Sequence, residues 1–136
     1  MKVLIVEPGK SPYEAEIEGG LEAMQAIVGG NIEVTYPFED PVGLICNEEG
    51  KFEGLPLNRA LFLEDGRPYD IIAGTFFVAG LDEEDFADLP QDLMDKYMER
   101  FRDPEVFIRS GDRILAIRQE AQEAVDEECE EELEPE

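Results

Sequence analysis

The sequence predicts one α+β domain with a mixed or mostly antiparallel sheet, one short helix and one longer helix. Three observations support this prediction. Short apolar or alternating runs recur along residues 1–118, apolar side chains fall at helical spacing in two further stretches, and strands and helices do not alternate strictly enough for a doubly wound sheet. A chain of 136 residues with 43% apolar residues is long enough for one domain with its own core.

The first third of the chain predicts three strands and the short helix. Residues 2–7 form an apolar, β-branched run that a Pro-Gly pair stops, and residues 13–18 alternate apolar and acidic side chains as a half-exposed strand does. Residues 21–28 place apolar side chains at helical spacing, and the Gly-Gly pair that follows ends the helix. Residues 31–38 alternate again and predict the third strand.

The middle of the chain predicts a hairpin and a long strand. Residues 42–47 and 51–52 are typical of two strands joined by a Glu-Glu-Gly turn. Residues 55–61 are ambiguous, and we favour a turn or a single helical turn. Residues 69–81 are apolar nearly throughout and predict the strongest strand, in which Gly74 indicates a bulge or a close approach of another backbone.

The last part of the body predicts the longer helix and another hairpin. The helix is expected over residues 82–101, where Pro90 either splits it or begins a second helix. Residues 106–108 and 113–117 then predict two strands around a Ser-Gly-Asp turn.

The chain is strongly acidic, and its charge divides into two parts. Thirty-five acids against eleven bases give a net charge of −24, of which residues 119–136 hold −10 and residues 1–118 hold −14. We expect residues 1–118 to be the folded domain and residues 119–136 to be an acidic tail, helical at most in part, because the tail cannot bury enough apolar surface. This charge argues against direct binding to nucleic acid or to anionic membranes and favours a basic protein partner.

Two further features predict a cytoplasmic protein. The sequence has no run of about 18 consecutive apolar residues, so no membrane span is expected. Its opening apolar run, residues 3–6, lacks the length and the cleavage site of a signal peptide. The two cysteines, Cys46 and Cys129, do not make a disulfide framework.

The motifs of common catalytic sites are missing from the sequence. Histidine is absent, so no Ser-His-Asp or Cys-His arrangement can form within the chain. The sequence has no phosphate-binding loop, no dinucleotide fingerprint and no Cys-x-x-Cys pair. Residues 82–85 are dense in carboxylates but lack the spacing of a calcium loop, and such acids commonly complement a helix N-terminus. We therefore predict a protein without enzymatic activity, metal or cofactor.

The first hypothesis for its function is a protein-binding accessory role, including that of an acidic DNA mimic that occupies the basic grooves of defence proteins. On the predicted longer helix, carboxylates three and four residues apart share one face and lie about 5 Å apart along the axis, which resembles a row of phosphates. Any surface helix also presents a polar face to solvent. The predicted acidic stripe consists of Asp85, Asp88, Asp92, Asp95 and Glu99.

The second hypothesis is the binding or sequestration of a small ligand, such as a nucleotide or a metabolite. Glycines after the short helix and within the long strand allow a backbone to approach a ligand, and polar side chains nearby supply contacts. The same glycines also suit a helix stop and a bulge, so this hypothesis stays open. The candidate ligand residues are Gln25, Gly29, Gly30, Asn31, Asn58, Arg59, Gly74 and Thr75. A third hypothesis is a plain interaction module in which acidity serves solubility.

Several phrases of the sequence resemble an uncharacterised family, number 3846 among the domains of unknown function. They are found in order at residues 6–10, 21–33, 36–38, 55–59 and 70–75. The resemblance implies a small protein of gut bacteria, their mobile elements and phages, and it implies no activity. Together with the residues themselves, it favours a non-enzymatic binding or accessory protein.

Overall fold

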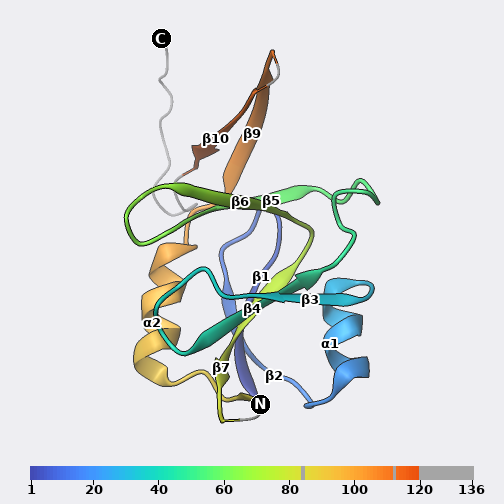
Figure 1. The fold of residues 1–136 in the computed structure, drawn as a ribbon, viewed down its shortest axis with the longest axis vertical. Coiled ribbons are helices and arrows are strands. Elements are labelled where there is room, and N and C mark those ends of the chain that lie inside the picture. Colours follow the sequence, from blue (N-terminus) through green and yellow to red (C-terminus); the bar gives the residue numbers. More distant parts are fainter. Residues whose placement is uncertain (84, 112, 120–136) are drawn as a thin grey trace.

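A central antiparallel sheet organises the protein in its computed structural model, which describes residues 1–83, 85–111 and 113–119 (Figure 1). Its strands are β1 Lys2–Val6, β2 Tyr13–Glu16, β3 Ile32–Thr35, β4 Val42–Asn47, β7 Phe76–Leu81 and β8 Phe86–Ala87. They follow the order β2, β1, β7, β4, β3, and β8 pairs with β7 outside this path. Each of these pairs is antiparallel.

A helix covers each face of the sheet. Successive residues of a strand point to opposite faces, so the buried central strands β1, β4 and β7 supply two separate cores. The core beside α1 (Leu21–Val28) consists of Val3, Ile5, Met24, Val28, Ile45, Phe77 and Ala79. The larger core beside α2 (Gln91–Arg100) includes Leu4, Val6, Leu44, Phe76, Val78, Met94 and Tyr97. These layers confirm the predicted α+β fold class.

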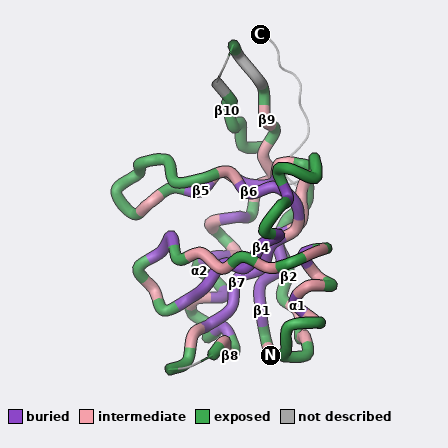
Figure 2. Tube along the Cα trace, turned by 45° about the vertical axis from the view of Figure 1, so that its right-hand side comes forward, coloured by how far each residue is buried: buried purple, intermediate pink, exposed green. Residues whose placement is uncertain are grey.

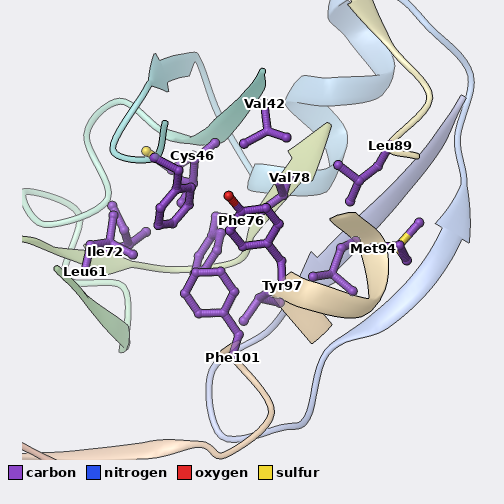
Figure 3. Packing of buried hydrophobic residues seen from close by; sticks show 14 residues of the cluster. Val42, Cys46, Leu61, Ile72, Phe76, Val78, Leu89, Met94, Tyr97 and Phe101 are labelled. Atoms are coloured by element: carbon purple, nitrogen blue, oxygen red, sulfur yellow. The ribbon is translucent and has the colours of Figure 1, made fainter. Parts of the chain in front are cut away.

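Aromatic rings fill the core beside α2 (Figure 3). The rings of Phe38 and Tyr97 lie 4.8 Å apart between centroids, and those of Phe76 and Phe101 meet edge to face at 5.4 Å. Such pairs add stability beyond their buried area. The core therefore joins the loop before β4, strand β7 and the whole length of α2.

Two hairpins lie outside the central sheet. β5 (Leu57–Phe62) and β6 (Pro68–Ala73) pair with two register irregularities and bury Leu61 and Ile72 in the core beside α2. β9 (Glu105–Ser110) and β10 (Arg113–Arg118) pair residue by residue and project from the end of the molecule remote from the N-terminus (Figure 1). This confirms the hairpin predicted over residues 106–108 and 113–117. The predicted tail lies outside the described residues, except for Gln119.

The short helix is predicted correctly. α1 occupies residues 21–28, and Gly29 ends it with a φ of 82° while its N–H donates to the Gln25 carbonyl oxygen at 2.8 Å. Only glycine adopts this left-handed conformation without steric cost, which is why the Gly-Gly pair marks the end of the helix.

Two predictions for the middle of the chain are wrong. Residues 51–52 are not a strand but part of a series of turns over residues 48–54. The Asn47 side chain accepts the Glu49 N–H at 2.7 Å and so turns the chain away from the sheet where β4 ends. Residues 55–61, expected to form a turn, contain most of β5, because tertiary partners hold this segment extended.

The strand predicted over residues 69–81 is two strands, β6 and β7, in different sheets. Gly74 lies between them with a φ of 85°, and its N–H donates to the Pro56 carbonyl oxygen at 2.7 Å. A Cβ at this position would lie 2.7 Å from Leu55 Cδ1. The predicted close approach is therefore present, but it separates two strands.

The helix predicted over residues 82–101 begins only at Gln91. The Asp82 N–H donates to the Asp85 carbonyl oxygen at 2.8 Å, which turns the chain so that β8 pairs back onto β7. Pro90 then stands at the N-cap of α2. A proline has no N–H for the hydrogen bond that a continuous helix would need here.

A buried arginine joins β5 to the end of α2. Arg59 is completely buried, and its guanidinium donates five hydrogen bonds, one for each N–H group. Nε and Nη2 donate to the Phe101 carbonyl oxygen at 3.2 and 2.8 Å, and Nη2 also donates to the Lys10 carbonyl oxygen at 2.7 Å. Phe101 is the C-cap of α2, so the positive charge meets the negative end of the helix dipole.

Asn58 extends this connection to β1 of the central sheet and to the turn before β7. Its Oδ1 accepts a bond from Arg59 Nη1 at 2.8 Å, and its Nδ2 donates to the carbonyl oxygens of Val6 and Gly74, each at 2.9 Å. Burial lowers the pKa of Arg59, while the carboxylate of Glu105 opposes this shift. Arginine has so high an intrinsic pKa that the side chain stays protonated.

A second connection joins the loop between β3 and β4 to α2. Asp40 Oδ2 accepts hydrogen bonds from Lys96 Nζ and from Tyr97 Oη, both at 2.6 Å. These bonds, that from Lys96 most strongly, lower the pKa of Asp40. Burial and the bond to Asp40 raise the pKa of Tyr97, which therefore remains a hydrogen-bond donor at neutral pH.

We expect Arg59→Met to lower the free energy of unfolding by about 3 kcal/mol or more, because the buried Phe101 and Lys10 carbonyl oxygens lose their charged donor. Arg59→Lys should recover little, since an ammonium group does not reproduce the planar fork of five donors. Urea-induced unfolding at pH 7 measures both. The control Arg67→Met removes an exposed guanidinium and should change stability by less than about 0.5 kcal/mol. A loss below about 1 kcal/mol in Arg59→Met would contradict the role given to this side chain.

We expect Asp40 to contribute stability that disappears in acid. Its folded pKa lies below the unfolded value of about 3.9, so the contribution is fully present above that value and is lost as pH falls through the folded pKa. The unfolding free energies of the wild type and of Asp40→Asn should therefore differ at pH 7 and converge below about pH 4. Glu39→Gln serves as the control, because it removes one charge from the same loop and leaves both hydrogen bonds. A gap that is constant over the whole titration speaks against this account.

Candidate functional site

Exposed apolar side chains gather on the β9–β10 hairpin and beside it. The described part of the chain has eleven exposed large hydrophobic side chains, and seven of them lie on β9–β10 or on the neighbouring β5–β6 hairpin. These seven are Phe62, Tyr69, Val106, Ile108, Ile114, Leu115 and Ile117. Single exposed hydrophobic residues are ordinary, whereas a contiguous group marks an interaction surface.

Four aliphatic side chains form a ladder on one face of the β9–β10 hairpin. The register pairs Ile108 with Leu115 and Val106 with Ile117, and residues two apart on a strand share a face. Each of the four is between 39% and 48% exposed. A two-stranded ribbon is only marginally stable by itself, so a face of this kind gains from being covered. Figure 2 shows how far the ribbon stands clear of the buried body.

A groove separates β10 from the β5–β6 hairpin. It encloses about 450 Å³, and most of its wall is apolar. One wall carries Leu57, Phe62, Tyr69 and Ile71, and the other carries Ile114 and Leu115. Lys51 and Asp70 also line the groove and form an ion pair with 2.6 Å between Nζ and Oδ1. The groove is thus an apolar channel with few polar groups.

Hydrogen bonds at the base of the β9–β10 hairpin hold the two walls in place. Glu105 Oε1 accepts the N–H of Ala60 in β5 at 2.9 Å, and Arg100 Nη2 donates to the Phe62 carbonyl oxygen at 2.9 Å. The Gln119 N–H donates to the Pro104 carbonyl oxygen at 2.6 Å and so closes the hairpin. The groove is therefore fixed to the end of α2, where Arg59 is buried.

The predicted ligand residues separate into two groups on opposite faces of the central sheet. Gln25, Gly29, Gly30 and Asn31 lie at the end of α1, where Gln25 Nε2 donates to Asn31 Oδ1 at 3.2 Å. A Cβ at Gly30 would lie 2.9 Å from Asn47 Nδ2, so a larger residue there would displace the Asn47 side chain. Both glycines therefore have structural roles: Gly29 ends α1, and Gly30 leaves room for the Asn47 side chain.

The second group lies on the side of α2. Asn58 and Arg59 are buried, and all five N–H groups of Arg59 already have acceptors, which leaves no donor for a ligand. Gly74 and the half-buried Thr75 form the turn between β6 and β7. No residue of either group lines the apolar groove.

The predicted acidic stripe is not one helical face. Asp92, Asp95 and Glu99 are exposed on α2, but Asp85 and Asp88 flank β8 instead. Asp88 Oδ1 accepts the backbone N–H of Lys2 at 2.9 Å, and Asp85 Oδ1 accepts the N–H of Phe86 at 2.7 Å. The helical prediction is wrong here because pairing of β8 with β7 competes with helix formation.

Other chemistry is limited in the part of the chain that the structure describes. Among these residues, no group of three or more acids or cysteines is placed to hold a metal ion. Within the same residues, no helix is long and apolar enough to cross a membrane. Cys46 is a free, buried thiol whose pKa is raised to about 11, mainly by burial, so it is not a nucleophile near neutral pH.

Sequence reasoning predicted the β9–β10 hairpin but not the exposure of its apolar side chains. The available signal is that apolar residues occupy both faces of the strands between residues 106 and 117 instead of alternating with polar ones. Such a run normally predicts burial on both faces. Here residues of β10 on both faces, Ile114 and Ala116 as well as Leu115 and Ile117, stay exposed, because no further layer covers them in the described residues.

Comparison with known proteins identifies the family. A family model described as Domain of unknown function (DUF3846) matches residues 1–102, which agrees with and extends the resemblance seen in the sequence. No curated protein and no solved structure matches the chain. The matched region contains the central sheet, both helices and β5–β6, and it ends before β9. One wall of the groove therefore lies inside the match and the other beyond it. The chain belongs to the DUF3846 family of domains of unknown function.

Proposed function

We propose that this protein is a non-enzymatic protein-binding module whose partner binds the β9–β10 hairpin and the apolar groove beside it. The observation that carries this proposal is the concentration of exposed aliphatic and aromatic side chains on these two hairpins. Surfaces of this kind on otherwise acidic, polar proteins mark sites of protein association.

The shape of the surface favours a protein partner over a small ligand. The aliphatic ladder continues the groove over the face of a projecting ribbon, which a small molecule in the groove would leave exposed. In the described residues, β9 and β10 pair only with each other, so each strand also has an unpaired edge. An extended segment of a partner can add to such an edge through backbone hydrogen bonds.

The remaining features of the chain suit a binding role. Histidine is absent from the sequence, and the Cys46 thiol is buried. The charge of −14 on residues 1–118 attracts a partner of net positive charge at long range. A free thiol is typical of the cytoplasm, and the family resemblance favours a bacterial or mobile-element setting. The acidic decoy receives less support, because the five carboxylates of the expected stripe are divided between α2 and the β8 region.

We expect the variant Val106→Thr/Ile108→Thr/Leu115→Thr/Ile117→Thr to lose its partner and keep its fold. Threonine is β-branched and favours strands, as do the valine and isoleucines that it replaces, while it reduces the apolar area of the ladder. Each protein is used as bait in an extract of the native host, and the captured partner is then purified and titrated. Its dissociation constant should rise at least tenfold, about 1.4 kcal/mol.

The matched control is Leu21→Thr/Phe52→Thr, which replaces two exposed apolar residues that lie away from the hairpin, 54% and 93% exposed. This variant should bind like the wild type. Capture of the same proteins by the hairpin variant, or of none by the wild type, would refute the proposed function. Circular dichroism and the melting temperature confirm that each variant is folded.

A further inference from the structure

We propose that the acidic tail of the same chain, residues 120–136, is the resident occupant of the apolar groove between β10 and β5–β6. This inference rests on the proposed function, because it describes how the binding surface is covered when no partner is bound. Four observations support it, concerning where the tail begins, how far it reaches, how its apolar residues are spaced and how its charge compares with that of the hairpin.

The tail begins beside the groove. β10 ends at Arg118, which pairs with Glu105 at the base of the hairpin, and the Gln119 N–H is bonded to the Pro104 carbonyl oxygen at 2.6 Å. The β10 wall of the groove lies at Ile114 and Leu115, only a few residues earlier in the chain. A segment that starts at this point needs only to reverse its direction to lie along β10.

The tail is long enough to cover the groove. As a helix, the fourteen residues 120–133, which precede the Glu-Pro pair at 134–135, extend about 21 Å. The six residues of β10 extend about 20 Å. The tail therefore has about the length of the strand that forms one wall.

The apolar residues of the tail recur at helical spacing. Ala121, Val125, Cys129 and Leu133 follow one another at intervals of four residues, and acids occupy most other positions. On a helix these four side chains form one narrow apolar stripe with carboxylates around it. An amphipathic helix that places such a stripe in an apolar groove is a common mode of recognition.

The charges of the tail and of the hairpin region are opposite. Residues 100–118 contain five arginines and three acids, a local charge of +2 in a chain of −24. Residues 120–136 contain ten acids and no base. The positive local charge of the hairpin region therefore attracts the acidic tail. A partner that carries an apolar strip competes with the tail for the groove.

Paramagnetic relaxation in the full-length chain tests this inference. A nitroxide is attached at Glu127→Cys in a Cys129→Ser background, because position 127 lies opposite the apolar stripe on a helix. Cys46 is buried, with a pKa raised to about 11, and escapes labelling. The amide signals of residues 69–71 and 114–116 should lose most of their intensity, whereas those of α1 should keep theirs.

Two variants of the labelled chain sharpen the result. Val125→Ser/Leu133→Ser removes the two largest apolar contacts of the stripe and should restore the groove signals. Glu123→Asp/Glu130→Asp keeps the charge and the stripe, and it should leave the signal loss unchanged. No loss at the groove, or an equal loss over the whole molecule, overturns the inference. In a mixture, isotope-enriched chains without the nitroxide report only on contacts with a second copy that carries it. Signal loss at the groove of these chains assigns the groove to the tail of a second copy and overturns the inference as well.

A final comparison separates this inference from the proposed function. Deletion of residues 120–136 should tighten the binding of the captured partner several-fold, because the partner no longer displaces the tail. If the loss of groove signals depends on the tail but the wild type captures no partner, only the proposed function is refuted. If a partner is captured, its dissociation constant is unchanged by the deletion, and the nitroxide does not weaken the groove signals, only the docking of the tail is refuted.

Discussion

The fold depends on one buried cation. Arg59 lies where the end of α2, the chain after β1 and strand β5 converge, and each of its five N–H groups donates to an oxygen of these segments. A guanidinium can do this because it is planar and permanently charged, so its donors are directed even in a buried site. Carbonyl oxygens at a helix end are poor neutralisers compared with carboxylates, but the helix dipole adds to their negative potential. The Arg59–Asn58 pair thereby holds the β5–β6 hairpin against the main sheet.

The position of this pair has a consequence for the apolar surface of the two hairpins. Because β5 is held against α2, the chain that leaves α2 passes directly over β5, and Glu105 accepts the N–H of Ala60 there. The β9–β10 hairpin consequently stands beside β5–β6 and forms the groove with it. The same cation that stabilises the body therefore determines where the projecting hairpin begins, although it takes no part in the surface itself.

The family match covers one wall of the groove but not the other. Residues 1–102 supply a sheet with a helix on each face and one wall of the groove, and the residues that follow supply the other wall and the aliphatic ladder. In the proposed binding role, the negative charge of the body attracts a partner at long range, and the apolar hairpin makes the close contact.

Local pattern was sufficient to predict α1, β1 to β4 and the β9–β10 hairpin, because apolar period, glycine stops and turn residues act over only a few neighbours. The uneven charge and the missing histidine were equally visible in the sequence. Only the tertiary structure showed that Asn58 and Arg59 are buried connectors and that Gly74 separates two sheets, since their partners are distant in the chain. It also showed that the apolar ladder of β9–β10 is exposed. An apolar strand has the same local pattern whether or not another layer covers it, so exposure is decided by what packs against it.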